Sequence, residues 1–187
     1  MPETDARAAL RARQGEGARY DAPSAPAADL LLARRGTAYF ARCLNNLTDE
    51  QLFAPSDIAG ASRAYVVAEV SYAARHQAMA LTSLAGPAAP GMNDEEPIFP
   101  TLDLAATLPG RALRYLFHHA EIHLNVCWRD LSDADWERDV TLPDDLVLTA
   151  RSLPLRRARE VWTAALHLGN GARARDIPDS LRPALLG

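Results

Sequence analysis

Four separate stretches of this chain repeat apolar residues with the period of an α-helix, and this repetition constrains the fold more than any other feature. The stretches cover residues 29–47, 62–84, 109–131 and about 155–168. Each spans several helical turns and carries a wide apolar face, which a chain in water buries against another element. The pattern therefore predicts an all-α fold in which four helices pack as a bundle.

The connections between these helices carry turn and capping signals of their own. Residues 48–51 and 132–136 predict short capped turns. RDVTL-PDD-LVLTA, residues 138–150, alternates around a turn signal and predicts a small β-hairpin between the third and fourth helices. Residues 86–106 are rich in proline and contain an acidic DEE, which predicts a long loop of the kind that often carries function. Residues 179–186 predict a short terminal helix.

The domain organisation is simple. Residues 1–28 have no persistent apolar period and include APSAPAA, so we expect a flexible N-terminal arm. Residues 29–187 form the single bundle domain, and 187 residues suit one domain with a sizeable core.

Composition narrows the class of partner. The net charge of −4 gives no general electrostatic case for nucleic acid, and no apolar run reaches the roughly 18 residues that span a bilayer. Cys43 and Cys127 form no CxxC motif and lie in apolar helical contexts, which favours a cytoplasmic location. No phosphate-binding or dinucleotide-binding glycine motif occurs. We expect a small-molecule substrate, no nucleic acid, no membrane, and a monomer or a homodimer.

The second helix places four polar side chains near one face. Tyr65, Glu69, Tyr72 and His76 follow one another at spacings of four, three and four. Two interpretations stay open: a solvated stripe with two amphipathic tyrosines, or a set that faces a substrate.

The third helix carries His119 and His123 one turn apart, which is the spacing of two ligands on one metal ion. With Leu116 and Val126 they would form an inner stripe. The same spacing is common by chance, so surface histidines or histidines satisfied within the core are the alternative.

The fourth helix places Glu160 and His167 on one stripe. They could face a functional cavity. Alternatively, Glu160 pairs with Arg156 or Arg157 across one turn, and His167 is stabilised by the helix dipole at the C-terminal end. Arg157 and Arg159 are expected to support the fold or to bind acidic groups outside the cavity.

Three blocks of sequence resemble one known family in the same order. They are LTDEQLFAPSDIAG followed by SRAYVVAEV, then LSDADWERDV, and then LPLRRAREVWTAALHLGNG with DIPDSLRPALL. These blocks resemble the mycothiol-dependent maleylpyruvate isomerase-like proteins of the DinB superfamily, over about residues 29–186. The resemblance implies a DinB-like four-helix bundle. It also implies thiol-dependent isomerisation or thiol transfer at a divalent metal, often zinc.

The family's metal ligands are a His on the second helix, then a Glu and a His one turn apart on the fourth. Three such ligands leave a position open for a thiol or a substrate. Matched to this sequence, the first position is Glu69, which the resemblance thereby implies to lie inside the bundle. The second is Glu160 and the third is Ala164, which cannot coordinate a metal. An Asp further along the family's helix corresponds to His167. One of the three ligands is therefore retained.

Three hypotheses follow. The first is a small-molecule enzyme of bacterial secondary metabolism (an isomerase, cyclase or lyase) in which Glu69, Glu160 and His167 perform acid–base catalysis without a resident cofactor. The second keeps zinc and a thiol cosubstrate in a site rebuilt from those three residues with His119 or His123. The third is a non-catalytic bundle that binds a ligand or dimerises. The expected substrate-binding residues are Tyr65, Tyr72, His76, His119 and His123.

Overall fold

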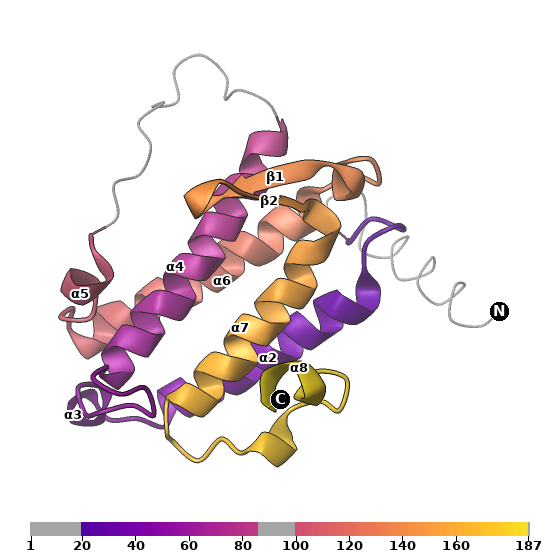
Figure 1. Cartoon of the computed structure of the whole chain (residues 1–187). Coiled ribbons are helices and arrows are strands. Elements are labelled where there is room, and N and C mark those ends of the chain that lie inside the picture. The colour runs from indigo at the N-terminus through magenta and orange to yellow at the C-terminus, as the bar shows by residue number, and fades with distance from the viewer. Residues whose placement is uncertain (1–19, 86–99, 187) are drawn as a thin grey trace, which may run out of the picture.

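The structure, a computed structural model, describes residues 20–85 and 100–186. The first 19 residues of the predicted arm and residues 86–99 of the predicted loop lie outside the described part of the chain. Four long helices form the bundle, as predicted: α2 (Ala27–Asn45), α4 (Arg63–Thr82), α6 (Gly110–Asp130) and α7 (Leu153–His167) (Figure 1).

The remaining elements are short. They are the helices α3 (Asp49–Leu52), α5 (Leu102–Ala105) and α8 (Arg182–Leu186), the strands β1 (Asp139–Leu142) and β2 (Leu146–Thr149), and the 3-10 turns Ser83–Ala85, Asp135–Glu137, Pro143–Asp145, Ala150–Ser152 and Ala174–Asp176. The helix α5 lies inside the segment predicted to be a loop. It forms because the side chain of Thr101 accepts a hydrogen bond from the backbone N–H of Leu104 and so caps the first turn.

The four long helices lie at the corners of a square, so that each helix packs on two neighbours. Helix α2 packs mainly on α7 and helix α4 mainly on α6, while contacts of α4 with α7 and of α2 with α6 join the two pairs. The side chains between them form one apolar core in which Phe40 of α2 meets Phe117 of α6, with ring centroids 4.8 Å apart. No helix in the two described stretches is both long enough and apolar enough to cross a membrane.

The predicted β-hairpin is present. Strands β1 and β2 pair antiparallel, with Asp139 opposite Thr149 and Leu142 opposite Leu146. The hairpin lies across one end of the bundle beside α4 (Figure 1). The alternation predicted from the sequence explains this position, because Val140 and Leu142 of β1 are buried.

The other end of the bundle is held by Arg63. Its guanidinium donates to the backbone carbonyl oxygens of Leu168 (2.6 Å) and Gly169 (3.0 Å), just beyond the last turn of α7. Helix ends leave carbonyl groups without partners inside the helix, so these bonds satisfy them and fix the end of α7 against the start of α4.

Candidate functional site

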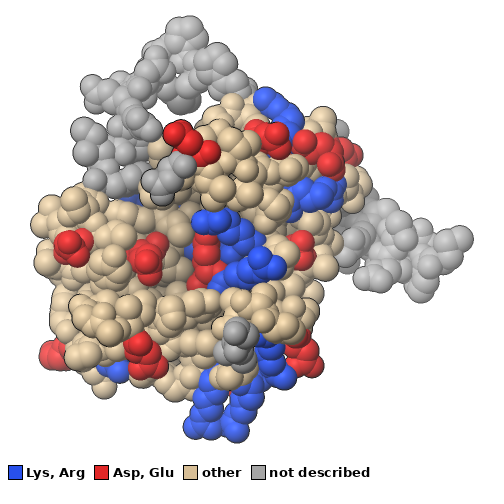
Figure 2. All heavy atoms as spheres, viewed as in Figure 1, with Lys and Arg blue, Asp and Glu red and all other residues tan. Residues whose placement is uncertain are grey.

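Helices α4 and α7 run antiparallel, and three contacts fix their alignment. Arg63 bonds Leu168 at one end, whereas further along Arg157 Nη1 donates to the carbonyl oxygen of Val70 (2.8 Å) and Gln77 Nε2 donates to Glu160 Oε2 (2.8 Å). This alignment brings Glu69 close to the level of Ala164. We call the seam that bears Glu69, Arg156, Glu160, Ala164 and His167 the α4–α7 face. Glu69 and Arg156 are exposed there, Glu160 and His167 are half-buried, and Ala164 is buried. Figure 2 shows acidic and basic side chains adjoining on the face of the molecule in view.

Glu160 is held by three protein partners on this face. Its Oε1 pairs with Arg156 Nε at 3.0 Å, and its Oε2 accepts from Gln77 at 2.8 Å and lies 3.5 Å from Arg157 Nη1. The side chain is still 22% exposed. The predicted ion pairing of Glu160 with its neighbouring arginines is therefore confirmed, and the carboxylate is held in one orientation while part of it faces solvent.

Arg157 lies inside the bundle, which confirms the expectation that it supports the fold and excludes the alternative that it binds acidic groups outside the cavity. Its side chain has no exposure, and it donates to Val70 of α4, to Glu121 of α6 and to Glu160. Glu121 accepts a further hydrogen bond from Thr37 Oγ1 of α2 at 3.0 Å. The network thus joins all four long helices, and a buried charge requires such pairing.

The position of Glu121 was available in the sequence but was missed. Phe117, Glu121 and Leu124 follow one another at spacings of four and three, so the carboxylate sits on the buried face of α6. A charge on an apolar face needs a buried partner of opposite sign, and Arg157 is that partner.

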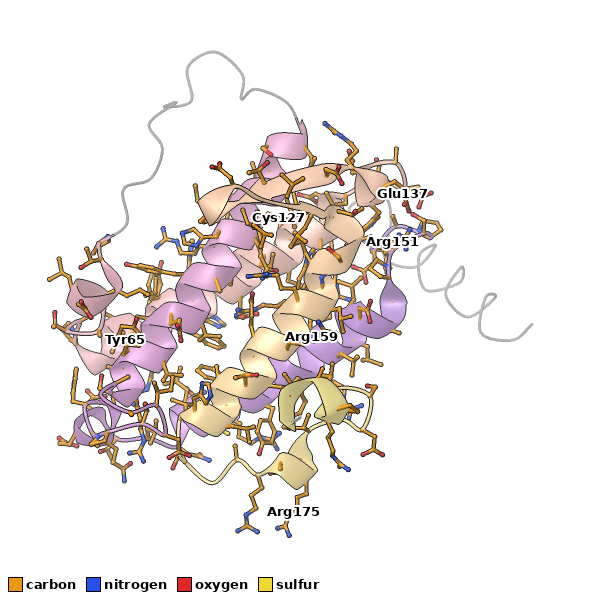
Figure 3. The ribbon with its side chains drawn as sticks, in the orientation of Figure 1. Tyr65, Cys127, Glu137, Arg151, Arg159 and Arg175 are labelled. Carbon is orange, nitrogen blue, oxygen red and sulfur yellow. The ribbon has the colours of Figure 1, made fainter. Side chains whose placement is uncertain are left out.

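The side chains predicted on the second helix do not behave as one set. Glu69 is exposed, so the expectation that it lies inside the bundle is wrong. Tyr72 is buried, and burial raises the pKa of its hydroxyl although Arg75 acts in the opposite direction. His76 is half-buried, and its ring lies 6.4 Å from that of Tyr72; burial and then Arg75 lower its pKa. Tyr65 is half-buried near the start of α4 (Figure 3).

His119 and His123 lie on the outer side of α6. Both are exposed, with ring centroids 6.4 Å apart. Partial burial lowers the pKa of His123, and His119 and Arg75 lower it further. The surface interpretation of this pair is therefore confirmed, and the predicted inner stripe does not form, since Val126 is also exposed.

His167 is half-buried in the last turn of α7, and its backbone carbonyl accepts from the N–H of Asp57 at 2.8 Å. Two helical turns, about 10 Å along the axis, separate it from Glu160. The structure therefore places both residues on the α4–α7 face without bringing their side chains into direct contact.

The donor set of this face does not fit the family's metal. Ala164 offers no ligand atom, Glu69 is exposed, and both oxygens of Glu160 already meet protein donors. His123, from the alternative set, lies on the outer side of α6. Within residues 20–85 and 100–186, no three His, Cys, Asp or Glu side chains gather as a metal site requires.

A four-helix bundle with a hairpin between its third and fourth helices is the DinB-like fold. The family model described as the mycothiol maleylpyruvate isomerase N-terminal domain matches residues 33–167, and the chain belongs to this family.

Two solved structures are similar to this chain. One is the crystal structure of a mycothiol-dependent maleylpyruvate isomerase, at 28% identity, and the other is a mutant of such an isomerase, at 27%. Each match covers 84% of this chain with a TM-score of 0.71, and this chain spans 66% of the length of each solved chain. No curated protein matches the chain.

Proposed function

We propose that this chain is a small-molecule enzyme, of isomerase, cyclase or lyase type, that performs acid–base chemistry at the α4–α7 face without the family's metal. One observation carries the proposal: Glu160, which the resemblance matches to a ligand position of the family, is fixed by Arg156, Arg157 and Gln77 and remains 22% exposed. A carboxylate fixed in orientation and open to solvent on one side can exchange a proton with a bound molecule.

Glu69 and His167 complete the proposed set. The helix alignment brings Glu69 close to the level of Ala164, one turn beyond Glu160. His167 provides an imidazole at the far end of the same face. The half-buried Tyr65 precedes Glu69 on α4 and the half-buried His76 follows it, and both would contact the substrate.

A thiol cosubstrate belongs to the same proposal. Both similar structures are described as mycothiol-dependent, and the family is named for mycothiol. When a thiol adds to the carbon–carbon double bond of a substrate, that bond becomes single and can rotate. When the thiol leaves again, the double bond re-forms. Such a step needs a group that accepts the thiol proton and returns it, and we assign this role to Glu160.

A cytoplasmic role in bacterial biosynthesis completes the proposal. Cys43 and Cys127 are free thiols, which suits a reducing compartment. The neighbouring genes test the biosynthetic part: genes of primary metabolism alone around this one would contradict it.

The test begins with maleylpyruvate and mycothiol, the compounds in the relatives' names, and follows isomerisation by NMR with and without the thiol. We expect turnover that survives a chelator and falls about 100-fold or more in Glu160→Gln, the usual range for the loss of a positioned acid or base. Arg159→Gln, an exposed change one residue away, is the control.

Other outcomes would overturn the proposal. Full activity in Glu160→Gln would remove Glu160 from the chemistry. One equivalent of zinc in protein purified without added metal, with activity lost to the chelator, would favour the rebuilt metal site. Binding of either compound without turnover would favour the non-catalytic bundle.

A further inference from the structure

A hollow of about 300 Å³ lies between α2 and α6, away from the α4–α7 face. In the square of four helices, the α2–α6 edge is opposite the α4–α7 edge. Its lining comes from the last turns of α2 and the second and third turns of α6: Ala41, Leu44, Asn45, Arg114, Tyr115, Phe117 and His118.

The floor of the hollow is apolar and buried. Leu44 and Phe117 are 2% and 3% exposed, and Phe40 packs behind Phe117 with ring centroids 4.8 Å apart. The short side chain of Ala41 leaves space above this floor. Because α2 packs mainly on α7 and α6 mainly on α4, contact between helices is sparsest along the α2–α6 edge.

Arg114 closes one end. Its Nη1 pairs with Asp49 Oδ1 at 2.5 Å, and its Nη2 donates to the carbonyl oxygen of Leu47 at 2.6 Å. Both terminal nitrogens are thus bound to the protein, and the positive charge of Arg114 is offset by the negative charge of Asp49. The rim therefore presents little net charge to a ligand.

The rest of the rim is polar and aromatic. Asn45 and His118 are exposed, and each can donate or accept a hydrogen bond. Tyr115 is 68% exposed, with its ring 5.9 Å from that of His119. An apolar floor, an aromatic wall and neutral hydrogen-bonding groups are the usual components of a small-molecule site, and 300 Å³ is at the lower end of their size range.

We propose that this hollow is a binding site for a small, neutral aromatic molecule with one hydrogen-bonding group, of the phenol class. The ring lies on Leu44 and Phe117 beside Tyr115, and the polar group reaches Asn45 or His118. A charged head group gains little, because Asp49 offsets Arg114. The site is independent of the proposed reaction, since it lies on the opposite edge of the bundle.

The test uses three probes of one size, 4-fluorophenol, 4-fluorobenzoate and fluorobenzene, with binding to the full chain followed by fluorine NMR. We expect 4-fluorophenol to bind with a dissociation constant on the order of 1 mM, as a site of this size and openness allows. The other two probes should bind at least several-fold more weakly. Tighter binding of the benzoate, or no binding of the phenol, would overturn the proposal.

Two variants locate the site. Ala41→Trp fills the hollow and should abolish binding of 4-fluorophenol, whereas Ala38→Trp, an exposed change one turn earlier on α2, should leave it unchanged. Tyr115→Ser removes one wall and should weaken binding several-fold even if Ala41→Trp does not fold. Binding that persists unchanged in folded Ala41→Trp, or in Tyr115→Ser, would place the probe elsewhere and refute the site.

Discussion

Arg157 of α7 contacts two other helices of the bundle, α4 and α6, through its guanidinium. It is fully buried, and its guanidinium meets a carbonyl of α4 and carboxylates of α6 and α7. Burial of a guanidinium is costly, and here the cost is offset by the pairing with Glu121 and Glu160. The stability of the fold therefore depends on keeping Arg157 together with its carboxylate partners. The loss of either side of this pairing leaves an uncompensated buried charge on the other.

Removing Arg157 alone tests this dependence. Arg157→Met should lower the free energy of unfolding by about 3–5 kcal/mol, since it leaves Glu121 unpaired inside the bundle. Adding Glu121→Leu to that variant should recover much of the loss, because an apolar pair replaces a broken ion pair. Urea unfolding measures the change in the free energy of unfolding for both variants. Arg159→Met, an exposed change on the same helix (Figure 3), is the control, and its change should be near zero. A loss no larger than that of the control would contradict the network's role.

The site residues show what a sequence pattern reveals and what it leaves open. The spacing of Glu160 from Arg156 and Arg157 is local, so its ion pairs could be predicted. The link from Arg157 to Glu121 joins helices far apart in the chain, and helical period alone does not decide which arginine turns inward. The burial of Glu69 was predicted wrongly, because a resemblance matches a residue to a position in the family but does not determine how deeply its side chain is buried.

At the scale of the elements, α2 and α7 approach each other closely at Gly36. A Cβ at position 36 would lie 2.5 Å from Val161 Cγ2 and 2.8 Å from Trp162 Nε1, which is too close for a real contact. Gly36→Ala should therefore destabilise the protein by about 1–3 kcal/mol, although alanine normally improves a helix by about 1 kcal/mol.

The matched control lies on the same helix. Ala38 is exposed, so Ala38→Gly should show only the ordinary helix penalty of about 1 kcal/mol. Thermal and urea unfolding compare the two variants. Stabilisation by Gly36→Ala would mean that α2 and α7 are further apart than the structure places them.

A second link joins α2 to the segment after α7. Tyr39 Oη donates to Asp176 Oδ2 at 2.8 Å, and its ring stacks on Trp162 with centroids 4.9 Å apart. Burial, followed by the hydrogen bond to Asp176, raises the pKa of Tyr39 from its ordinary 10.0 to about 12. A tyrosine whose pKa is raised on folding binds its proton more strongly in the native state than in the unfolded state.

The sign of the pH effect follows from this. The contribution of Tyr39 to stability is fully present below pH 10 and is lost as the pH rises towards 12. Unfolding measured from pH 9 to pH 12 should show this loss in the native protein and a smaller one in Tyr39→Phe. The exposed Tyr115→Phe is the control and should follow the native curve. Identical curves for the native protein and Tyr39→Phe would contradict the assignment.

At the scale of the whole molecule, local periodicity was enough to predict the architecture. The four predicted helices and the hairpin agree with the structure, with helix ends displaced by about two residues. The agreement arises because the apolar face of each helix, and the alternation of each strand, depends only on residues within one continuous segment. The α2–α6 hollow could not be predicted, since it arises from unequal packing between helices that are distant in the sequence. Pairing of elements depends on complementary side chains across the bundle and has no local signature.

The alignment of α4 with α7 predicts that two substitutions can create a zinc site between these helices. If Glu69, Glu160 and Ala164 occupy the three ligand positions implied by the resemblance, then Glu69→His with Ala164→His recreates a His, Glu and His set around one point. Zinc is expected to displace the Arg156 ion pair from Glu160, because Arg156 is 44% exposed and such pairs are weak. The double variant should therefore bind one zinc ion per chain, whereas the native chain should bind none.

Cobalt absorption and elemental analysis measure this gain, and the control decides whether geometry produces it. Glu69→His with Thr163→His adds the same two imidazoles, but places the second one residue earlier, about 100° around the helix axis. That variant should not reach stoichiometric binding at the zinc concentration that saturates the first. Equal binding by both variants would mean that two added histidines suffice anywhere on this face. Failure of the first variant, while it stays folded, would mean that α4 and α7 are not aligned as the contacts of Arg63, Gln77 and Arg157 place them.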